Sequence, residues 1–198
     1  MWGEVCYCKR MLVWLYQEAV KLAKSIFEAI KERRSNREFR SDPVPYDTIR
    51  QIVEYGLKAP SAGNMQPWGL IIVKEPEIKA RLAKAAFGQK FVSDAPVVVV
   101  ILADPKRSAA RYGDRGSMLY CIQDTAACIQ NMLLASVGFG LCTCWVGSFD
   151  EQDVASILNL PGHLRPVAMV PIGYPMESNL PRGSRKDRPW DEVVKIIE

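Results

Sequence analysis

The sequence has few of the residues that build metal centres, and it has no strong excess of charge of either sign. It contains a single histidine, His163, and none of its six cysteines belongs to a Cys-x2-Cys pair. Structural zinc sites use paired Cys or His ligands at such spacings, so no metal site is expected. Lysine plus arginine number 26 against 22 aspartate plus glutamate, a net charge of +4. This balance gives no overall attraction to nucleic acid or to an anionic membrane, and neither is expected as a partner.

Two further absences narrow the chemistry. No G-x-G-x-x-G motif follows a strand and opens a helix, which excludes the usual dinucleotide-binding fingerprint. No Ser-His-Asp set or carboxylate pair suggests itself, so no catalytic side chain is predicted.

Membrane insertion and export are not expected either. The longest uncharged stretch, residues 125–149, is interrupted by Gln130, Asn131 and two glycines. The apolar run at residues 11–16 is too short for a signal peptide and is followed by Gln17 and Glu18. A cytoplasmic protein is therefore expected.

The pattern of apolar residues predicts one α+β domain with an N-terminal extension. With 198 residues and 48% hydrophobic content, the chain is long enough for one sizeable core. Residues 9–24 show helical periodicity, and Ser25 with Glu28 forms a capping box that begins a second helix ending near Arg33. A second capping box, Ser148 with Glu151, predicts another helix start.

Four apolar runs predict strands at residues 68–74, 96–103, 141–146 and 167–172. The run at 96–103 is continuously apolar, which indicates a central strand covered on both faces. Residues 117–137 read as one long, nearly uncharged helix that lies in the core or in a subunit interface. The expected architecture is a central sheet, mixed or mostly antiparallel, with helices on both faces.

The first candidate site is the basic cluster that contains Arg33, Arg34, Ser35, Arg37 and Arg40. Guanidinium and hydroxyl donors converging from one side would suit a phosphate monoester. A solvated basic end of a helix, which complements the helix dipole, explains the cluster equally well.

Two loops are further candidates. Residues 59–68 combine small residues and prolines with Asn64 and Gln66, whose amides could meet the edge of a heterocycle, although an ordinary helix-to-strand turn has the same composition. In residues 138–147, Gly147 could present a free backbone N–H. Cys142 and Cys144 are interpreted as buried packing residues, because no activating base lies beside them.

The C-terminal region offers the last candidates. Its arginines, Arg185 among them, either fold back to meet the same anion as the cluster around Arg33 or form a solvated arm. His163 is interpreted as a loop residue without a catalytic partner.

Five motifs in order resemble the FMN-dependent nitroreductase family. They are Arg-Arg-Ser at 33–35, Ala-Pro-Ser-x-x-Asn-x-Gln-Pro-Trp at 59–68, Gly-Leu-x-Thr-Cys-Trp-x-Gly at 140–147, Pro-Val-Ala at 166–168 and Pro-Ile-Gly-Tyr-Pro at 171–175. The resemblance covers residues 25–197. It implies a nitroreductase-like sandwich, an FMN-binding domain over 25–198 with a helical extension over 1–24, and an intertwined homodimer that holds FMN at the subunit interface.

The resemblance also implies the site residues. Arg33, Ser35 and Arg37, with Arg34 beside them, would hold the FMN phosphate, ribityl or ring oxygens, and Arg185 would close on the phosphate. The loop around Asn64 and Gln66 would meet the ring from the facing subunit, and the strand ending at Gly147 would lie along the ring. The implied cofactor-binding residues are Arg33, Arg34, Ser35, Arg37, Pro60, Ser61, Asn64, Gln66, Thr143, Cys144, Trp145, Gly147 and Arg185.

The implied chemistry is ping-pong hydride transfer from NAD(P)H, through flavin N5, to a nitroaromatic, a quinone or a similar electron-poor acceptor. Since the flavin carries the reaction, no catalytic side chain is required. Other branches of the family carry out reductive dehalogenation or oxygen-dependent flavin cleavage, and these stay open. A non-catalytic flavin-binding protein, with the ring covered by residues 1–24, is the alternative from a different class; a module that binds nucleic acid through the arginines is a weaker one.

Overall fold

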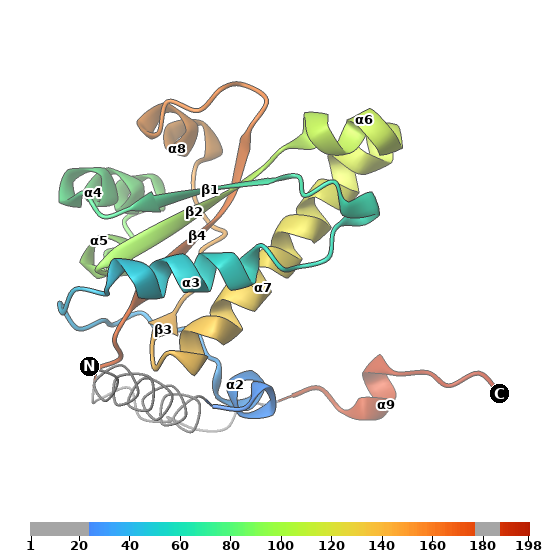
Figure 1. The fold of residues 1–198 in the computed structure, drawn as a ribbon, viewed down its shortest axis with the longest axis horizontal. Coiled ribbons are helices and arrows are strands. Elements are labelled where there is room, and N and C mark those ends of the chain that lie inside the picture. Colours follow the sequence, from blue (N-terminus) through green and yellow to red (C-terminus); the bar gives the residue numbers. More distant parts are fainter. Residues whose placement is uncertain (1–23, 177–186) are drawn as a thin grey trace, which may run out of the picture.

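The computed structural model describes residues 24–176 and 187–198, and its centre is a single antiparallel sheet. The strands lie in the order β1-β2-β4-β3, and each neighbouring pair is antiparallel (Figure 1). They are β1 (Trp68–Val73), β2 (Val97–Ala103), β3 (Cys142–Thr143) and β4 (Arg165–Gly173). The predicted α+β architecture is confirmed.

Strand β2 is central, as its composition predicted. Every residue of β2 is buried, and the strand pairs with β1 on one side and β4 on the other, for example Val99 with both Ile72 and Val170. β-branched side chains pack well on such a pleated surface, and burial on both faces removes the need for alternating polar residues.

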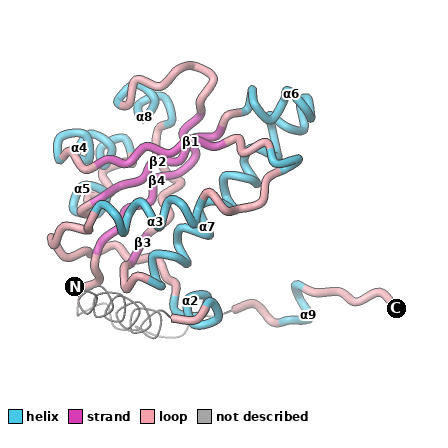
Figure 2. Tube along the Cα trace, viewed as in Figure 1, coloured by secondary structure: helices cyan, strands magenta, loops and turns pink. Residues whose placement is uncertain are grey.

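Helices cover both faces of this sheet (Figure 2). The core on one face joins the sheet to α3 and α7, and the core on the other face includes residues of α4 and α8. The helices are α2 (Ile26–Glu32), α3 (Tyr46–Gly56), α4 (Pro76–Ala85), α5 (Phe91–Asp94), α6 (Pro105–Arg115), α7 (Cys121–Gly138), α8 (Glu151–Ile157) and α9 (Trp190–Val193).

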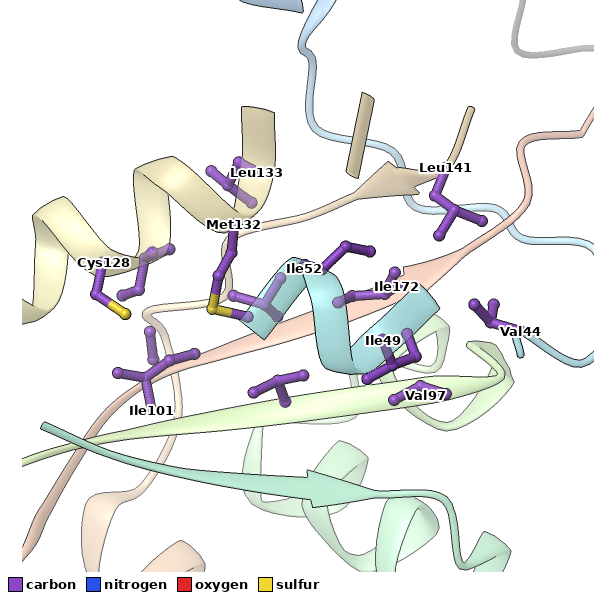
Figure 3. Close-up of a cluster of buried hydrophobic side chains, with 14 of the residues drawn as sticks. Val44, Ile49, Ile52, Val97, Ile101, Cys128, Met132, Leu133, Leu141 and Ile172 are labelled. Carbon is purple, nitrogen blue, oxygen red and sulfur yellow. The ribbon is translucent and has the colours of Figure 1, made fainter. Parts of the chain in front are cut away.

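Helix α3 packs beside α7 in the core on one face of the sheet. Figure 3 shows Ile49 and Ile52 of α3 gathered with Met132 of α7 above β2. All three side chains are fully buried, and each contributes roughly 1.5–3 kcal/mol through burial. This contact fixes the end of α3, from which the chain enters the loop at residues 57–67.

One of the two predicted capping boxes is confirmed and the other is wrong. At α2 the Ser25 side chain accepts the Glu28 N–H, and the Glu28 carboxylate accepts the Ser25 N–H. At α8 the N-cap is Asp150, whose carboxylate accepts the Asp153 N–H at 2.8 Å, so Ser148 lies outside the helix. Asp150 satisfies the same orphan backbone donors as a serine and stands closer to the helix.

The long helix predicted over residues 117–137 is divided. A π-helical turn, η2 (Gly116–Tyr120), precedes α7. A Cβ atom at Gly116 would lie 2.5 Å from the Ser108 carbonyl oxygen, so the chain turns here against the backbone of α6. Helix α6, which begins with Pro105 after the N-cap Asp104, was not predicted from the sequence.

The edge strand is shorter than predicted. Only residues 142–143 form β3, after which Val146 pairs with Met169 in an isolated bridge. The helix predicted over residues 9–24 and the extension over 1–24 lie almost wholly outside the described residues. In the described part of the chain, no helix is both long and apolar enough to cross a membrane.

Candidate functional site

The arginine cluster lies against the edge of the sheet. Arg33 is the C-cap of α2, and the chain leaves the helix in an extended conformation. Ser35 forms a parallel bridge with Thr143 of β3, and the Asn36 N–H donates to the Thr143 carbonyl oxygen at 2.9 Å. Residues 33–37 are therefore brought beside residues 142–147, although more than 100 residues separate the two segments in sequence.

Three guanidinium groups are concentrated in this segment. In the part of the chain that the structure describes, no ion pair involves Arg33, Arg34 or Arg37. Arg34 donates to the Glu32 carbonyl oxygen at 3.4 Å, and Arg37 lies over the Phe91 ring at 5.9 Å. Their positive charges are thus not neutralised by described carboxylates, which suits a bound anion.

The strand next to these arginines has an open edge. Val146 exchanges two backbone hydrogen bonds of 2.9 Å with Met169, so its N–H and C=O point toward β4. The neighbouring residues, Trp145 and Gly147, therefore direct their backbone groups away from the sheet. Gly147 is exposed, and a Cβ atom there would meet nothing closer than the Trp145 indole nitrogen at 3.9 Å. This edge can hold a flat ligand with backbone donors.

The two cysteines of this region are packed into the protein. Burial raises the pKa of Cys142 to about 12. It also raises the pKa of Cys144, against a smaller opposite effect from the Arg37 charge and the Ser35 hydroxyl. Cys142 packs with Phe39 and Ala95. Since the thiolate is the reactive form, the geometry agrees with the packing interpretation of both residues.

The second half of the site is the loop at residues 60–67. Its centre is a short 3-10 turn, η1 (Ala62–Asn64), and the Ser61 hydroxyl accepts the Gln66 N–H at 3.0 Å. Asn64 and Gln66 have left-handed backbone conformations, with φ of 56° and 49°. Their side chains are exposed and joined by a 2.9 Å hydrogen bond. Pro60 is exposed as well.

Within one chain these two halves lie at opposite ends of α7. Figure 1 shows the loop beside α6, whereas the segment at residues 33–37 runs near α2 and β3. The loop contacts Asp124 in the first turn of α7, while Thr143 follows the last turn. From Asp124 to Gly138 the helix rises through 14 residues, roughly 21 Å. The structure therefore does not bring Asn64 and Gln66 to the arginines of the same chain.

The remaining residues considered in the sequence analysis do not belong to either half of the site as described. Arg185 lies outside the described residues, and His163 is an exposed loop residue, as predicted. The sequence reading missed Asp124, Arg107 and Arg111, which contact the loop. The signal available for Asp124 was that it is the last charged residue before the long uncharged stretch.

A groove of about 510 Å³ lies between α2, α3 and α7. None of the predicted cofactor-binding residues lines it. Its lining includes Ile26, Tyr55, Leu134 and Phe139, and the neighbouring Phe27 and Ile30 side chains of α2 are 73% and 54% exposed. Exposed apolar surface of this kind is typical of a protein interface.

Comparison with known proteins identifies the relatives of the chain. A family model described as "Nitroreductase family" matches residues 30–93 and 86–174. A protein named NADH dehydrogenase from Thermus thermophilus is 34% identical over 180 residues, which covers 77% of this chain and 88% of that protein. A Bacillus subtilis protein named FMN reductase (NAD(P)H) is 26% identical over 186 residues, covering 87% of this chain and 73% of that protein.

The fold is shared with solved structures. Nitroreductase A from Vibrio parahaemolyticus matches with a TM-score of 0.78 and 28% identity, over 88% of this chain and 76% of that one. The predicted nitroreductase-like fold is confirmed by this match.

Proposed function

The chain belongs to the nitroreductase family, and we propose that it is an NAD(P)H-dependent FMN oxidoreductase that acts as a homodimer on a nitroaromatic, a quinone or a similar electron-poor acceptor. The names of the Thermus and Bacillus relatives support the electron donor and the flavin. The observation that carries the proposal is the arginine segment at residues 33–37, which lies along an open sheet edge with outward backbone groups.

The donors present fit FMN. A phosphate group requires several charge-assisted donors, and Arg33, Arg34 and Arg37 provide them without a described carboxylate in competition. The absence of a side chain at Gly147 leaves room for a flat ring against the strand. When bound, FMN supplies the capacity to accept and donate hydride.

Each group of residues then has a separate task. Arg33 and Arg34, with the Ser35 hydroxyl, bind the phosphate and ribityl oxygens. Arg37 and the outward N–H of Gly147 stabilise negative charge at the polar edge of the ring. Replacing Arg37 by Ala should make the flavin harder to reduce, and an unchanged midpoint potential would remove this role.

A homodimer completes the site. Asn64 and Gln66 lie at the far end of α7 from the arginines of their own chain, so we assign them to the site of the facing subunit, where their amides bind the ring. The exposed apolar side chains of α2 and the groove beside them support contact with a second copy. The C-terminal segment at residues 187–198 extends away from the sheet (Figure 1) and exposes Trp190 and Ile197, which supports the intertwined arrangement.

Subunit complementation tests the proposal. Chains carrying Arg37→Ala and chains carrying Asn64→Ala are given different tags, co-expressed, and purified as the mixed dimer. If each site uses Arg37 of one chain and Asn64 of the other, one of the two sites is intact in the mixed dimer, and about half of the wild-type NAD(P)H oxidation returns.

The matched control is a mixed dimer in which one chain carries Arg33→Ala and the other carries Arg37→Ala. Both substitutions fall in the same segment, so both sites are damaged and no recovery is expected. A mixed Arg37→Ala and Asn64→Ala dimer no more active than either parent would contradict the shared site.

A further inference from the structure

The loop that carries Asn64 and Gln66 is attached to α7 through a buried carboxylate. Asp124 is only 8% exposed, and both of its carboxylate oxygens accept the Ala62 N–H, at 3.1 and 3.2 Å. Burial raises the pKa of Asp124, and the bond from Ala62 partly opposes this effect. Among the described residues, no lysine or arginine forms an ion pair with Asp124. Asp124 is therefore a buried carboxylate whose described hydrogen-bond partner is a backbone N–H of the loop.

Helix α6 holds the same loop from another side. The Arg107 guanidinium donates to the Met65 carbonyl oxygen, and the Arg111 guanidinium donates to the Gly63 carbonyl oxygen at 3.3 Å. Gly63 has a φ of 53°, a conformation that glycine adopts without strain, and a Cβ atom there would lie 2.4 Å from the Tyr112 hydroxyl and 2.7 Å from the Arg111 guanidinium. The loop is thus bonded through both its N–H and its C=O groups.

These bonds oppose an intrinsically unfavourable conformation. Asn64 and Gln66 both adopt positive φ values, which non-glycine residues rarely do. Such conformations persist when the surrounding structure over-determines them. Asp124 holds the N–H of Ala62, two residues before Asn64, and Arg107 holds the C=O of Met65, which stands between Asn64 and Gln66.

We propose that Asp124 and Arg107 are positioning residues that hold the loop at residues 61–66 in the conformation which presents Asn64 and Gln66 to the flavin. This inference rests on the proposed function, because that function assigns the two amides to the ring. Asp124 and Arg107 act through the loop backbone, whereas Asn64 and Gln66 make the contact.

Amide hydrogen exchange in protein freed of flavin tests the positioning directly. Asp124→Ala removes the acceptor of the Ala62 N–H, and we expect the exchange of residues 62–66 to accelerate about tenfold or more. Asp124→Asn keeps one carbonyl oxygen and should restore most of the protection. Arg107→Ala should accelerate exchange in the same segment, which keeps the test decisive if Asp124→Ala does not fold.

Two matched controls separate the loop from general stability. Asp150→Ala removes another aspartate bonded to a backbone N–H, at the N-cap of α8. Lys106→Ala removes an exposed charge beside Arg107 that makes no described bond to the loop. Neither control should change exchange at residues 62–66.

The dissociation constant of FMN, measured by fluorescence titration, provides the second readout. Faster loop exchange together with about tenfold weaker FMN binding in Asp124→Ala and Arg107→Ala, and in neither control, is the expected result. Unchanged exchange would overturn the positioning role while leaving the proposed function intact, provided that the wild-type protein binds FMN. Faster exchange with unchanged FMN affinity would also overturn it, because the order of the loop would then not serve the cofactor. Absence of FMN binding by the wild-type protein would instead refute the proposed function, and the inference with it.

Discussion

The contact between α3 and α7 provides a prediction whose size follows from the structure. A Cβ atom at Gly56 would lie 2.5 Å from Cγ and 3.1 Å from Sδ of Met132, and 3.2 Å from Sγ of Cys128. Met132 is fully buried and has little room to move. Overpacking of this kind costs about 1–3 kcal/mol, against which alanine gains at most about 1 kcal/mol over glycine in helix propensity. Gly56→Ala should therefore destabilise the protein by up to about 3 kcal/mol.

The effect of Gly56→Ala on the free energy of unfolding should change sign when Met132 is replaced by alanine. Met132→Ala alone costs about 2–5 kcal/mol because it leaves a cavity. In that background the new methyl group at Gly56 no longer meets Cγ or Sδ, it fills part of the cavity, and it keeps the gain in helix propensity. Gly56→Ala should then stabilise the variant.

Guanidinium chloride unfolding of the wild type, both single variants and the double variant gives the coupling energy. We expect it to be about 1–3 kcal/mol in favour of the double variant, with melting temperatures that differ by about 2–4 °C per kcal/mol for a chain of this length. Equal effects of Gly56→Ala in both backgrounds would refute the packing described between α3 and α7.

Three other predictions concern local features. Ser25→Ala should reduce the free energy of unfolding by about 1 kcal/mol, since it removes the cap of α2, whereas Ser25→Asp should be close to neutral. Cys142 has a pKa of about 12 and is buried, so iodoacetamide at pH 8 should label its peptide only after denaturation, and labelling of the native protein would contradict this burial. The bidentate pair of Arg165 with Glu151 lowers the pKa of the carboxyl below its ordinary value of 4.5. A depressed acid pKa gives stability that is present above 4.5 and lost as the pH falls through the lowered value, so a double-mutant cycle should show about 0.2–1 kcal/mol of coupling at pH 7 and none in strong acid.

Local patterns predicted the elements whose determinants lie close together in sequence. The capping box of Ser25 and Glu28 required only four consecutive residues, and the continuous apolar run at 97–103 identified the central strand by itself. The family motifs likewise identified the fold, because each is a contiguous segment and their order was sufficient.

Long-range partners could not be read in this way. Ala62 and Asp124 are separated by 62 residues, and Arg107 reaches a carbonyl 42 residues away. These bonds depend on how α6 and α7 are placed, and no spacing rule encodes that placement. The predicted capping box of Ser148 with Glu151 was wrong for a different reason: two acceptable capping residues, Ser148 and Asp150, stand two positions apart, and the helix uses the second.

The separation of the two half-sites also needed the structure. The sequence placed Arg33 and Asn64 in neighbouring parts of the chain, yet α3 and the length of α7 hold them apart. The resemblance had implied that the two segments serve different subunits, and the proposal of a shared site now rests on this separation.

The visible absorption spectrum of the purified protein, recorded anaerobically before and after addition of NADH or NADPH, tests whether the protein is an NAD(P)H-dependent flavin oxidoreductase. We expect a two-banded flavin spectrum that bleaches with at least one of the two nucleotides. Protein that shows no flavin bands even after FMN is supplied, or whose bound flavin stays oxidised with both nucleotides, would contradict it.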